Sequence, residues 1–206
     1  MARFGINPDK TLGLSIPFIR KTAKTIGKDH KIATGLWDSR IHEARILAGM
    51  VADPEKVSKE QMDSWAKGFD SWDVCDQVCM NLFRNTRFAY PKARQWADRN
   101  EEFVKRAGFA LMATLAAGDK NAGDDEFIKF FEAIKKHSVD NRNYVKKAVN
   151  WALRQIGKRN IRLNKLAVET ALQISKIDSK AATWITSDAL KELQSKNVLQ
   201  RLGRDG

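Results

Sequence analysis

The residues with the clearest chemical potential are a tryptophan and an aspartate in segment 71–79, which reads Ser-Trp-Asp-Val-Cys-Asp-Gln-Val-Cys. Trp72 and Asp76 are four positions apart, so on a helix they lie on one face, one above the other. An indole beside a carboxylate adds little to an ordinary core, whereas it suits a site that holds positive charge. The alternative is that Trp72 is core and that Asp76 is a structural carboxylate paired with Arg106 or Arg154.

The cysteines and histidines do not form a recognisable metal or disulfide pattern. Cys75 and Cys79 are one helical turn apart, which is poorly suited to a structural disulfide, and we expect both to be small core residues. His30, His42 and His137 are scattered along the chain. We therefore expect no metal and no cofactor.

The strongest global signal is a net charge of +12 over 206 residues. Such an excess is typical of proteins that bind a polyanion, above all nucleic acid, although a merely basic soluble protein is the alternative. The sequence has no apolar run long enough to span a membrane and no apolar signal region at its start, so we expect a cytoplasmic protein.

Almost every segment has the periodicity of a helix, and no convincing strand pattern is present. Ser15 and Ser58 precede two expected helices, Gly27 and Gly68 follow them, and a further short helix is expected over about 29–37. Further helices are expected over the following ranges: 40–50, the segment around 72–76, 90–96, 101–117, 124–137, 141–157 and 161–176. Two more are expected around Trp184 and around residues 190–193, before a frayed tail at about 195–206.

Three stretches resemble one another, namely 43–48, 105–110 and 146–151, each with small residues and one or two cations. Ala107 and Ala148 are 41 positions apart, within the range of roughly 40–47 residues for paired-helix repeats. We therefore predict an all-α fold, a curved solenoid of HEAT-like antiparallel helical pairs forming one domain over residues 1–206. An irregular helical bundle is the alternative.

Cations recur in the second helices of these repeats. Equivalent positions of a solenoid line one concave face, so these residues predict a basic groove that contacts DNA phosphates. For any single lysine, a solvated helix face is the commoner explanation. The predicted DNA-binding residues are Arg45, Lys105, Arg106, Lys146, Lys147 and Arg154.

Segments 72–76, 105–107 and 147–154 together resemble the AlkD-type DNA alkylation-repair glycosylases, which are built of HEAT-like repeats. Segments 13–21 and 37–45 are also similar to that family, and the resemblance extends from about residue 5 to 175. It implies that Trp72, Asp76 and Trp151 face the damaged nucleotide and that Arg106 holds the DNA backbone. It further implies excision of cationic N3- and N7-alkylpurines from duplex DNA without rotation of the base into a protein pocket.

The chemistry agrees with these implied roles. A cationic alkylpurine leaves without a general acid, and the deoxyribose gains oxocarbenium character that Asp76 would stabilise. The indoles of Trp72 and Trp151 would each add about 1–2 kcal/mol of cation–π stabilisation. No lysine stands out as a nucleophile, so we expect hydrolysis without strand cleavage. Either tryptophan could instead be ordinary core, as we expect for Trp37, Trp65, Trp96 and Trp184.

The chain departs from the family pattern before Gly13, where typical members have additional helices and this sequence has about a dozen residues. The resemblance implies that such a shortening can reduce or abolish excision by this chain, since some relatives with it look like DNA-binding proteins without robust glycosylase activity. Three hypotheses follow: a monomeric alkylpurine DNA glycosylase, a non-catalytic binder of damaged or branched DNA, and a helical-repeat scaffold for another protein.

Overall fold

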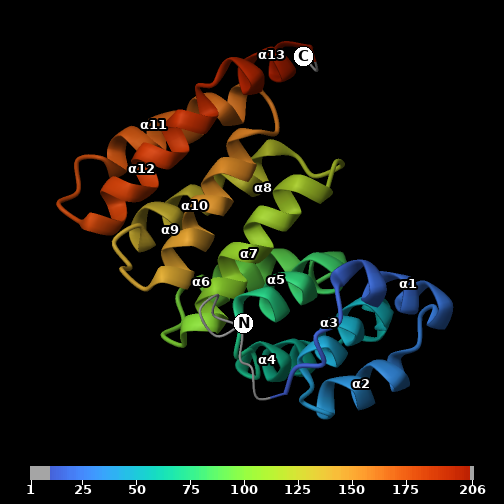
Figure 1. The fold of residues 1–206 in the computed structure, drawn as a ribbon. Coiled ribbons are helices and arrows are strands. Elements are labelled where there is room, and N and C mark those ends of the chain that lie inside the picture. Colours follow the sequence, from blue (N-terminus) through green and yellow to red (C-terminus); the bar gives the residue numbers. More distant parts are fainter. Residues whose placement is uncertain (1–9, 205–206) are drawn as a thin grey trace. The chain divides into compact units, whose positions relative to one another are not determined.

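Every regular element in residues 10–204, the part that the computed structural model describes, is a helix (Figure 1). This confirms the predicted all-α class. The described chain divides into two compact units, with the boundary between Ala89 and Tyr90. The single domain over residues 1–206 remains a prediction; residues 1–9 and 205–206, where it begins and ends, lie outside the described residues.

Unit 1, which ends at Ala89, is built from short helices with well-defined starts. Its elements are α1 (Ile16–Ile26), α2 (His30–Asp38), α3 (His42–Val51), η2 (Pro54–Lys56), α4 (Lys59–Lys67), α5 (Trp72–Asn81) and η3 (Phe83–Asn85). Ser15, Asp29 and Ser58 each accept a hydrogen bond from the backbone N–H three residues ahead, at 3.4, 2.9 and 3.1 Å. These contacts satisfy N–H groups of the first turn, as the sequence predicts for Ser15 and Ser58. Asp29, expected as the first residue of its helix, is instead the N-cap.

The helix α3 is central to unit 1, because α1, α2 and α5 all pack against it. Gly49 allows α5 to approach closely, since a Cβ at this position would lie 3.1 Å from Val78 Cγ2. Trp37 and Trp65 stack with ring centroids 4.3 Å apart, and both are buried, which confirms the prediction that they are core.

Unit 2, which begins at Tyr90, contains the longer helices. Its elements are α6 (Ala89–Ala97, whose first residue is the last of unit 1), α7 (Glu102–Gly118), α8 (Asp124–Ile128), α9 (Phe130–His137), α10 (Asn143–Gly157), α11 (Ile161–Ile174), α12 (Lys180–Leu193) and α13 (Lys196–Arg204). α10 packs against α7, α9, α11 and α12, and Figure 1 shows α11 and α12 side by side. Gly108 on α7 allows α6 to approach, because a Cβ there would lie 2.5 Å from the Ala97 nitrogen.

Three details of unit 2 differ from the sequence-based expectation. The helix expected over 124–137 is interrupted at Lys129, with Phe127 and Phe130 buried on either side. The two helices expected near its end are one helix, α12, because its buried residues continue as a single stripe from Ala181 to Leu193. Residues 196–204, expected within a frayed tail, form α13, whose Val198 and Leu202 are buried one turn apart.

The repeat is visible in polar contacts that connect positions at a nearly constant separation. In unit 2, Arg106 contacts Tyr144 and Arg154 contacts Glu192 across 38 residues, and Arg142 contacts Asn100 across 42. In unit 1 the separation is shorter, as in the contact of His42 with Asp73 across 31 residues. Equivalent residues of successive helical pairs therefore contact each other, as expected for a helical-repeat fold.

Candidate nucleic-acid interface

Trp72 and Asp76 lie on the half-buried face of α5. The opposite face is formed by Val74, Cys75, Val78 and Cys79, which are fully buried, so both cysteines are core residues as predicted. Trp72 is the first residue of the helix and Asp76 follows one turn later. The structure thus places the indole and the carboxylate on one face, with part of each side chain accessible.

A histidine–aspartate contact connects α5 to α3. His42 Nε2 lies 2.7 Å from Asp73 Oδ2, and Asp73 Oδ1 accepts a hydrogen bond from the Val74 N–H at 3.0 Å. Burial, the largest influence, opposes the charged imidazole, but the hydrogen bond and charge of Asp73, with Glu43 and Asp70, raise the pKa of His42 above 6.5. The contact fixes the first turn of α5, where Trp72 lies.

Glu43, the next residue of α3, binds the backbone that leads into α1. Its carboxylate accepts hydrogen bonds from the N–H groups of Leu12, Gly13 and Leu14 at 2.8, 2.7 and 3.3 Å. Gly13 has φ +74°, a conformation that a side chain would strain. Burial raises the pKa of the Glu43 carboxyl, but the backbone donors outweigh it and hold that pKa below 4.5.

Arg45 is buried within unit 1. Its NH1 donates to the Gly68 carbonyl at 3.0 Å and lies 3.7 Å from Asp70 Oδ2, and its guanidinium is 4.8 Å from the centroid of Trp37. These contacts join α3 to the turn that precedes α5. A DNA contact by Arg45 stays a prediction.

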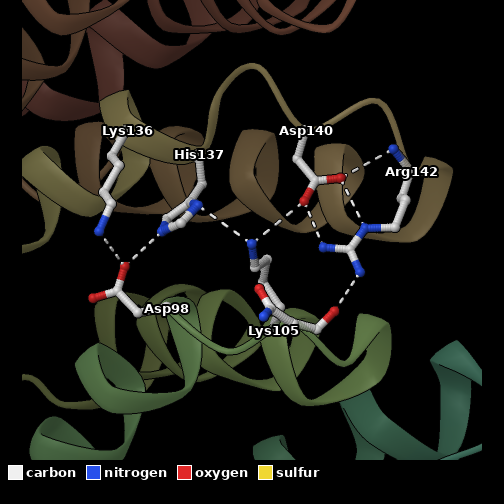
Figure 2. A network of polar contacts seen from close by, with 7 residues as sticks. Asp98, Lys105, Lys136, His137, Asp140 and Arg142 are labelled. Carbon is white, nitrogen blue, oxygen red and sulfur yellow. Dashed lines mark hydrogen bonds and ion pairs between the residues drawn. The ribbon is translucent and has the colours of Figure 1, made fainter.

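Lys105, expected to contact DNA, is buried in a network of charged residues between successive repeats (Figure 2). Its Nζ lies 3.5 Å from Asp140 Oδ2 and 3.4 Å from His137 Nδ1. Because an ammonium group only donates, His137 Nδ1 accepts, and Nε2 donates to Asp98 Oδ1 at 2.8 Å. His137 is therefore the neutral imidazole in this network.

The same network fixes the start of α10. Arg142 forms a two-pronged contact with Asp140, from Nε to Oδ1 at 3.0 Å and from NH2 to Oδ2 at 2.6 Å, and its NH1 donates to the Asn100 carbonyl at 2.7 Å. Burial raises the pKa of Asp140, but the bonds from Arg142 and the charge of Lys105 lower it below 3.8 overall. Lys105 thus has a carboxylate partner within the repeat.

Arg106, the neighbour of Lys105 on α7, is also buried. Its NH1 donates to the Tyr144 carbonyl in the first turn of α10 at 2.6 Å. The ring of Tyr144 stacks on Phe103 with centroids 5.5 Å apart. The predicted phosphate ligand therefore connects two adjacent helices of unit 2, and its contact with DNA remains a prediction.

The remaining predicted residues lie on α10. Trp151 is half-buried, and Lys147 is exposed. Lys146 Nζ lies 5.3 Å from the ring centroid of Trp184, which is 38% exposed, so the expectation that Trp184 is core was wrong. Trp184 is on the outer surface of α12 because Ile185 and Ala181 occupy the buried stripe.

Arg154 on α10 is engaged with acidic residues of α12. Its NH1 lies 2.5 Å from Glu192 Oε2 and 3.3 Å from Asp188 Oδ2. Trp96, like Trp37 and Trp65, is buried core as predicted. Of the proposed catalytic residues, Trp72 and Asp76 belong to unit 1, whereas Trp151 belongs to unit 2, where α7 and α10 pack together.

The network of Figure 2 was missed at the level of sequence, although a signal for it exists. Asp98 and His137 are 39 residues apart, close to the 41 residues that separate Ala107 and Ala148. Oppositely charged or hydrogen-bonding residues one repeat apart are therefore candidates for contacts between repeats. Within the described residues no group of three or more His, Cys, Asp or Glu is placed to hold a metal ion, and no helix is long and apolar enough to cross a membrane.

Helical pairs in register at a repeat of about 40 residues define a HEAT-like repeat protein. The family model described as DNA alkylation repair enzyme matches residues 1–193. The chain belongs to this family.

One similar solved structure supports the fold. One similar chain has a TM-score of 0.75 at 22% identity, with 91% of this chain and 84% of that chain covered. It is described as a new family of proteins related to the HEAT-like repeat DNA glycosylases with affinity for branched DNA structures. A designed armadillo repeat protein in complex with a (KR)4 peptide has a TM-score of 0.45 at 13% identity, covering 90% of this chain and 79% of that one. No curated protein is recognisably similar in sequence.

Proposed function

We propose that this protein is a monofunctional DNA glycosylase that hydrolyses the N-glycosidic bond of cationic N3- and N7-alkylpurines in duplex DNA. The observation that carries the proposal is the pair on α5, where Trp72 and Asp76 are one turn apart on a half-buried face. Membership of the DNA alkylation repair family supports it. We place the protein with chromosomal DNA in the cytoplasm and expect a single chain to act on one duplex.

The proposed reaction needs no general acid. When the bond between C1′ and the base nitrogen breaks, its electron pair neutralises the cationic purine, so the base leaves without a proton. The deoxyribose then carries oxocarbenium character, which the carboxylate of Asp76 stabilises most strongly where water is excluded. A water molecule adds its oxygen to C1′ and releases a proton to Asp76 or to solvent.

The indole groups would also stabilise positive charge. Trp72, and Trp151 on α10, present aromatic faces that would each contribute about 1–2 kcal/mol to a nearby cation when desolvated. Because neither step requires a residue to read the base edge, the damaged nucleotide need not enter a pocket.

The first experiment measures release of 7-methylguanine and 3-methyladenine from methylated duplex DNA by the wild-type protein and by Asp76→Asn. The substitution removes the charge at nearly constant shape, and we expect base release to fall by about 100-fold or more while duplex affinity changes little. Asp178→Asn, which changes an exposed carboxylate between α11 and α12, is the matched control and should retain wild-type activity. Equal base release by Asp76→Asn and wild type would remove Asp76 from the mechanism.

A second candidate function is binding of damaged or branched DNA without catalysis. The chain with a TM-score of 0.75 favours it, because that protein is described as having affinity for branched DNA structures. The two functions are separated by comparing a four-way junction with a linear duplex of equal length. Tight junction binding with no base release from the wild-type protein would favour the binder over the glycosylase.

A further inference from the structure

Unit 2 contains a cavity of about 510 Å³ that the proposed function does not use. Its walls come from the C-terminal ends of α7 and α10, the loop after α7, the first residue of α8, the turn between α10 and α11, and one residue of α13. The charged and polar side chains that line it are Lys120, Asp124, Gln155, Lys158, Arg159, Asn160 and Arg201. Four of these seven are cations and one is an anion.

Lys120 and Arg159 have a charge that no carboxylate of the described residues offsets. Lys120 is exposed, and no hydrogen bond or ion pair joins it to the described residues. Arg159 donates to the carbonyl oxygens of Ala116 and Asp119, both at 2.7 Å, and its guanidinium lies 4.0 Å from the ring centroid of Phe127. Carbonyl oxygens carry no net charge, and no carboxylate oxygen of the described residues lies within 4 Å of Arg159. The positive charge of Arg159 is therefore held rigidly at the cavity.

The other charged groups at the cavity do not neutralise the positive charge of Lys120 and Arg159. Lys158 Nζ lies 2.6 Å from Glu192, but Glu192 is shared with Arg154 at 2.5 Å. Arg201 donates to the Lys158 carbonyl at 3.1 Å, again without a carboxylate within the described residues.

The lining aspartate, Asp124, is already engaged away from these cations. It accepts a hydrogen bond from Asn160 Nδ2 at 2.7 Å and lies 3.5 Å from Arg162. The cavity thus has a net positive field.

The start of α11 adds to that field. This helix of 14 residues begins at Ile161, and Asn160, its N-cap, lines the cavity. The N-terminal end of a helix carries partial positive charge and N–H groups that favour an anion. A rigid guanidinium, an exposed lysine and a helix start are the groups that recognise a phosphate.

The position of the cavity relates it to the proposed site. Trp151, Gln155 and Lys158 follow one another on a single face of α10, since separations of four and seven residues return to that face. The rise from Trp151 to Lys158 is roughly 10 Å, about three nucleotide steps along a strand of duplex DNA. A strand that contacts Trp151 and follows α10 therefore reaches the cavity.

We infer that this cavity binds a backbone phosphate of the DNA strand whose nucleotide lies at Trp151, with Lys120, Arg159 and Arg201 as its ligands. The inference rests on the proposed function for the placement of the strand. Part of the affinity for duplex DNA then comes from Lys120, Arg159 and Arg201, which are not among the cations that recur in the second helices of the repeats.

The test measures duplex affinity as a function of salt concentration for wild type, Lys120→Gln and the double variant K120Q/R201Q. Each lost phosphate contact lowers the slope of log affinity against log salt by about one, so we expect a decrease of about one for the single and about two for the double variant. We expect Lys120→Gln to leave the fold unchanged, because Lys120 is exposed and has no hydrogen bond or ion pair with the described residues.

The matched control is K176Q/K180Q, which removes two exposed charges at the other end of α11. It should leave the slope at the wild-type value. If Lys120→Gln and K120Q/R201Q have the same slope as this control, the cavity is not a DNA contact and the inference is wrong. If the wild-type protein releases no base but the cavity variants lower the slope, the glycosylase proposal is wrong and the phosphate site is retained.

A measurement with inorganic phosphate tests whether the cavity binds free phosphate rather than a phosphate of the DNA backbone. The thermal midpoint of the wild-type protein is measured with millimolar phosphate and with chloride at equal ionic strength. A phosphate-specific rise that K120Q/R201Q abolishes, together with an unchanged duplex slope, would show a site for free phosphate and overturn the assignment to a DNA strand.

Discussion

At the residue scale, the cations that recur with the repeat are held mainly by protein acceptors. Arg106 donates to the Tyr144 carbonyl, Lys105 contacts Asp140, and Arg154 contacts Glu192. The first two side chains are buried, so their charge stabilises the contact between neighbouring repeats. A buried cation that loses its contacts costs more than the contacts contribute, which makes these positions sensitive to substitution.

Substitution of Arg106 by alanine tests this structural role at a single residue. Arg106→Ala removes a buried charged donor from the Tyr144 carbonyl and leaves a void, so we expect the free energy of unfolding to fall by about 2–4 kcal/mol. Urea denaturation gives this value, and Arg20→Ala, at an exposed position on α1, is the control that should change it little. The same variant also tests the predicted phosphate contact. If the slope of log duplex affinity against log salt falls by about one, Arg106 contacts a phosphate as well; if the slope is unchanged, its role is structural only.

At the element scale, α3 positions the helix that carries the proposed catalytic pair. His42 contacts Asp73 at the start of α5, and Glu43 binds three N–H groups of residues 12–14. Gly49 lets α3 and α5 approach closely. Because His42 and Glu43 are adjacent in the first turn of α3, this helix connects residues 12–14 to the start of α5, where Trp72 lies.

The substitution Glu43→Gln tests this coupling. An amide has one acceptor oxygen in place of two and adds a donor that faces N–H groups, so we expect a loss of about 1–3 kcal/mol in the free energy of unfolding at neutral pH. Glu55→Gln, at an exposed position in η2, is the matched control.

The pH dependence of this loss has a defined sign. The folded-state pKa of Glu43 is lowered from 4.5, so its contribution is present above 4.5 and is lost as pH falls through the folded-state pKa. The difference between wild type and Glu43→Gln should therefore shrink in acid. A difference that stays constant down to low pH would contradict an ionised Glu43 as the acceptor.

At the scale of the whole molecule, the two units contain histidines with opposite responses to pH. In unit 1, burial opposes the charge of His42, but the Asp73 contact and neighbouring acids raise its pKa above 6.5. In unit 2, burial lowers the pKa of His137 below 6.5, with Lys105 and Lys136 acting in the same direction against the bond to Asp98. His42 stabilises the fold below pH 6.5 and loses this effect as pH rises through its folded-state pKa.

His137 has the opposite sign, because its stabilising effect is present above pH 6.5 and is lost as pH falls. We expect the stability difference between wild type and His42→Asn to shrink from pH 5.5 to 7.5, and that between wild type and His137→Asn to grow. Urea denaturation of the three proteins at both pH values measures this. Differences that change in the same direction would contradict the assigned charge states.

Much of the fold was predictable because it depends on local spacing. Ser15, Asp29 and Ser58 cap helices through bonds to N–H groups three residues ahead, and Gly27 ends α1 with φ +74°. Residues four apart share a helix face wherever the helix lies, so the pairing of Trp72 with Asp76 also followed from the sequence. The helix breaks near Lys129 and the ordered α13 were not predictable, since buried contacts decide them.

The sequence by itself determined the all-α class, the helical repeat, the indole–carboxylate pair and the excess of positive charge. Only the tertiary structure decided which cations are neutralised and which remain available. In the sequence, a lysine that pairs with an acidic residue of the next repeat looks the same as a lysine that is available to bind a phosphate. Packing separates them, because the partner of Lys105 is 35 positions away at Asp140, whereas Lys120, Arg159 and Arg201 meet at one cavity.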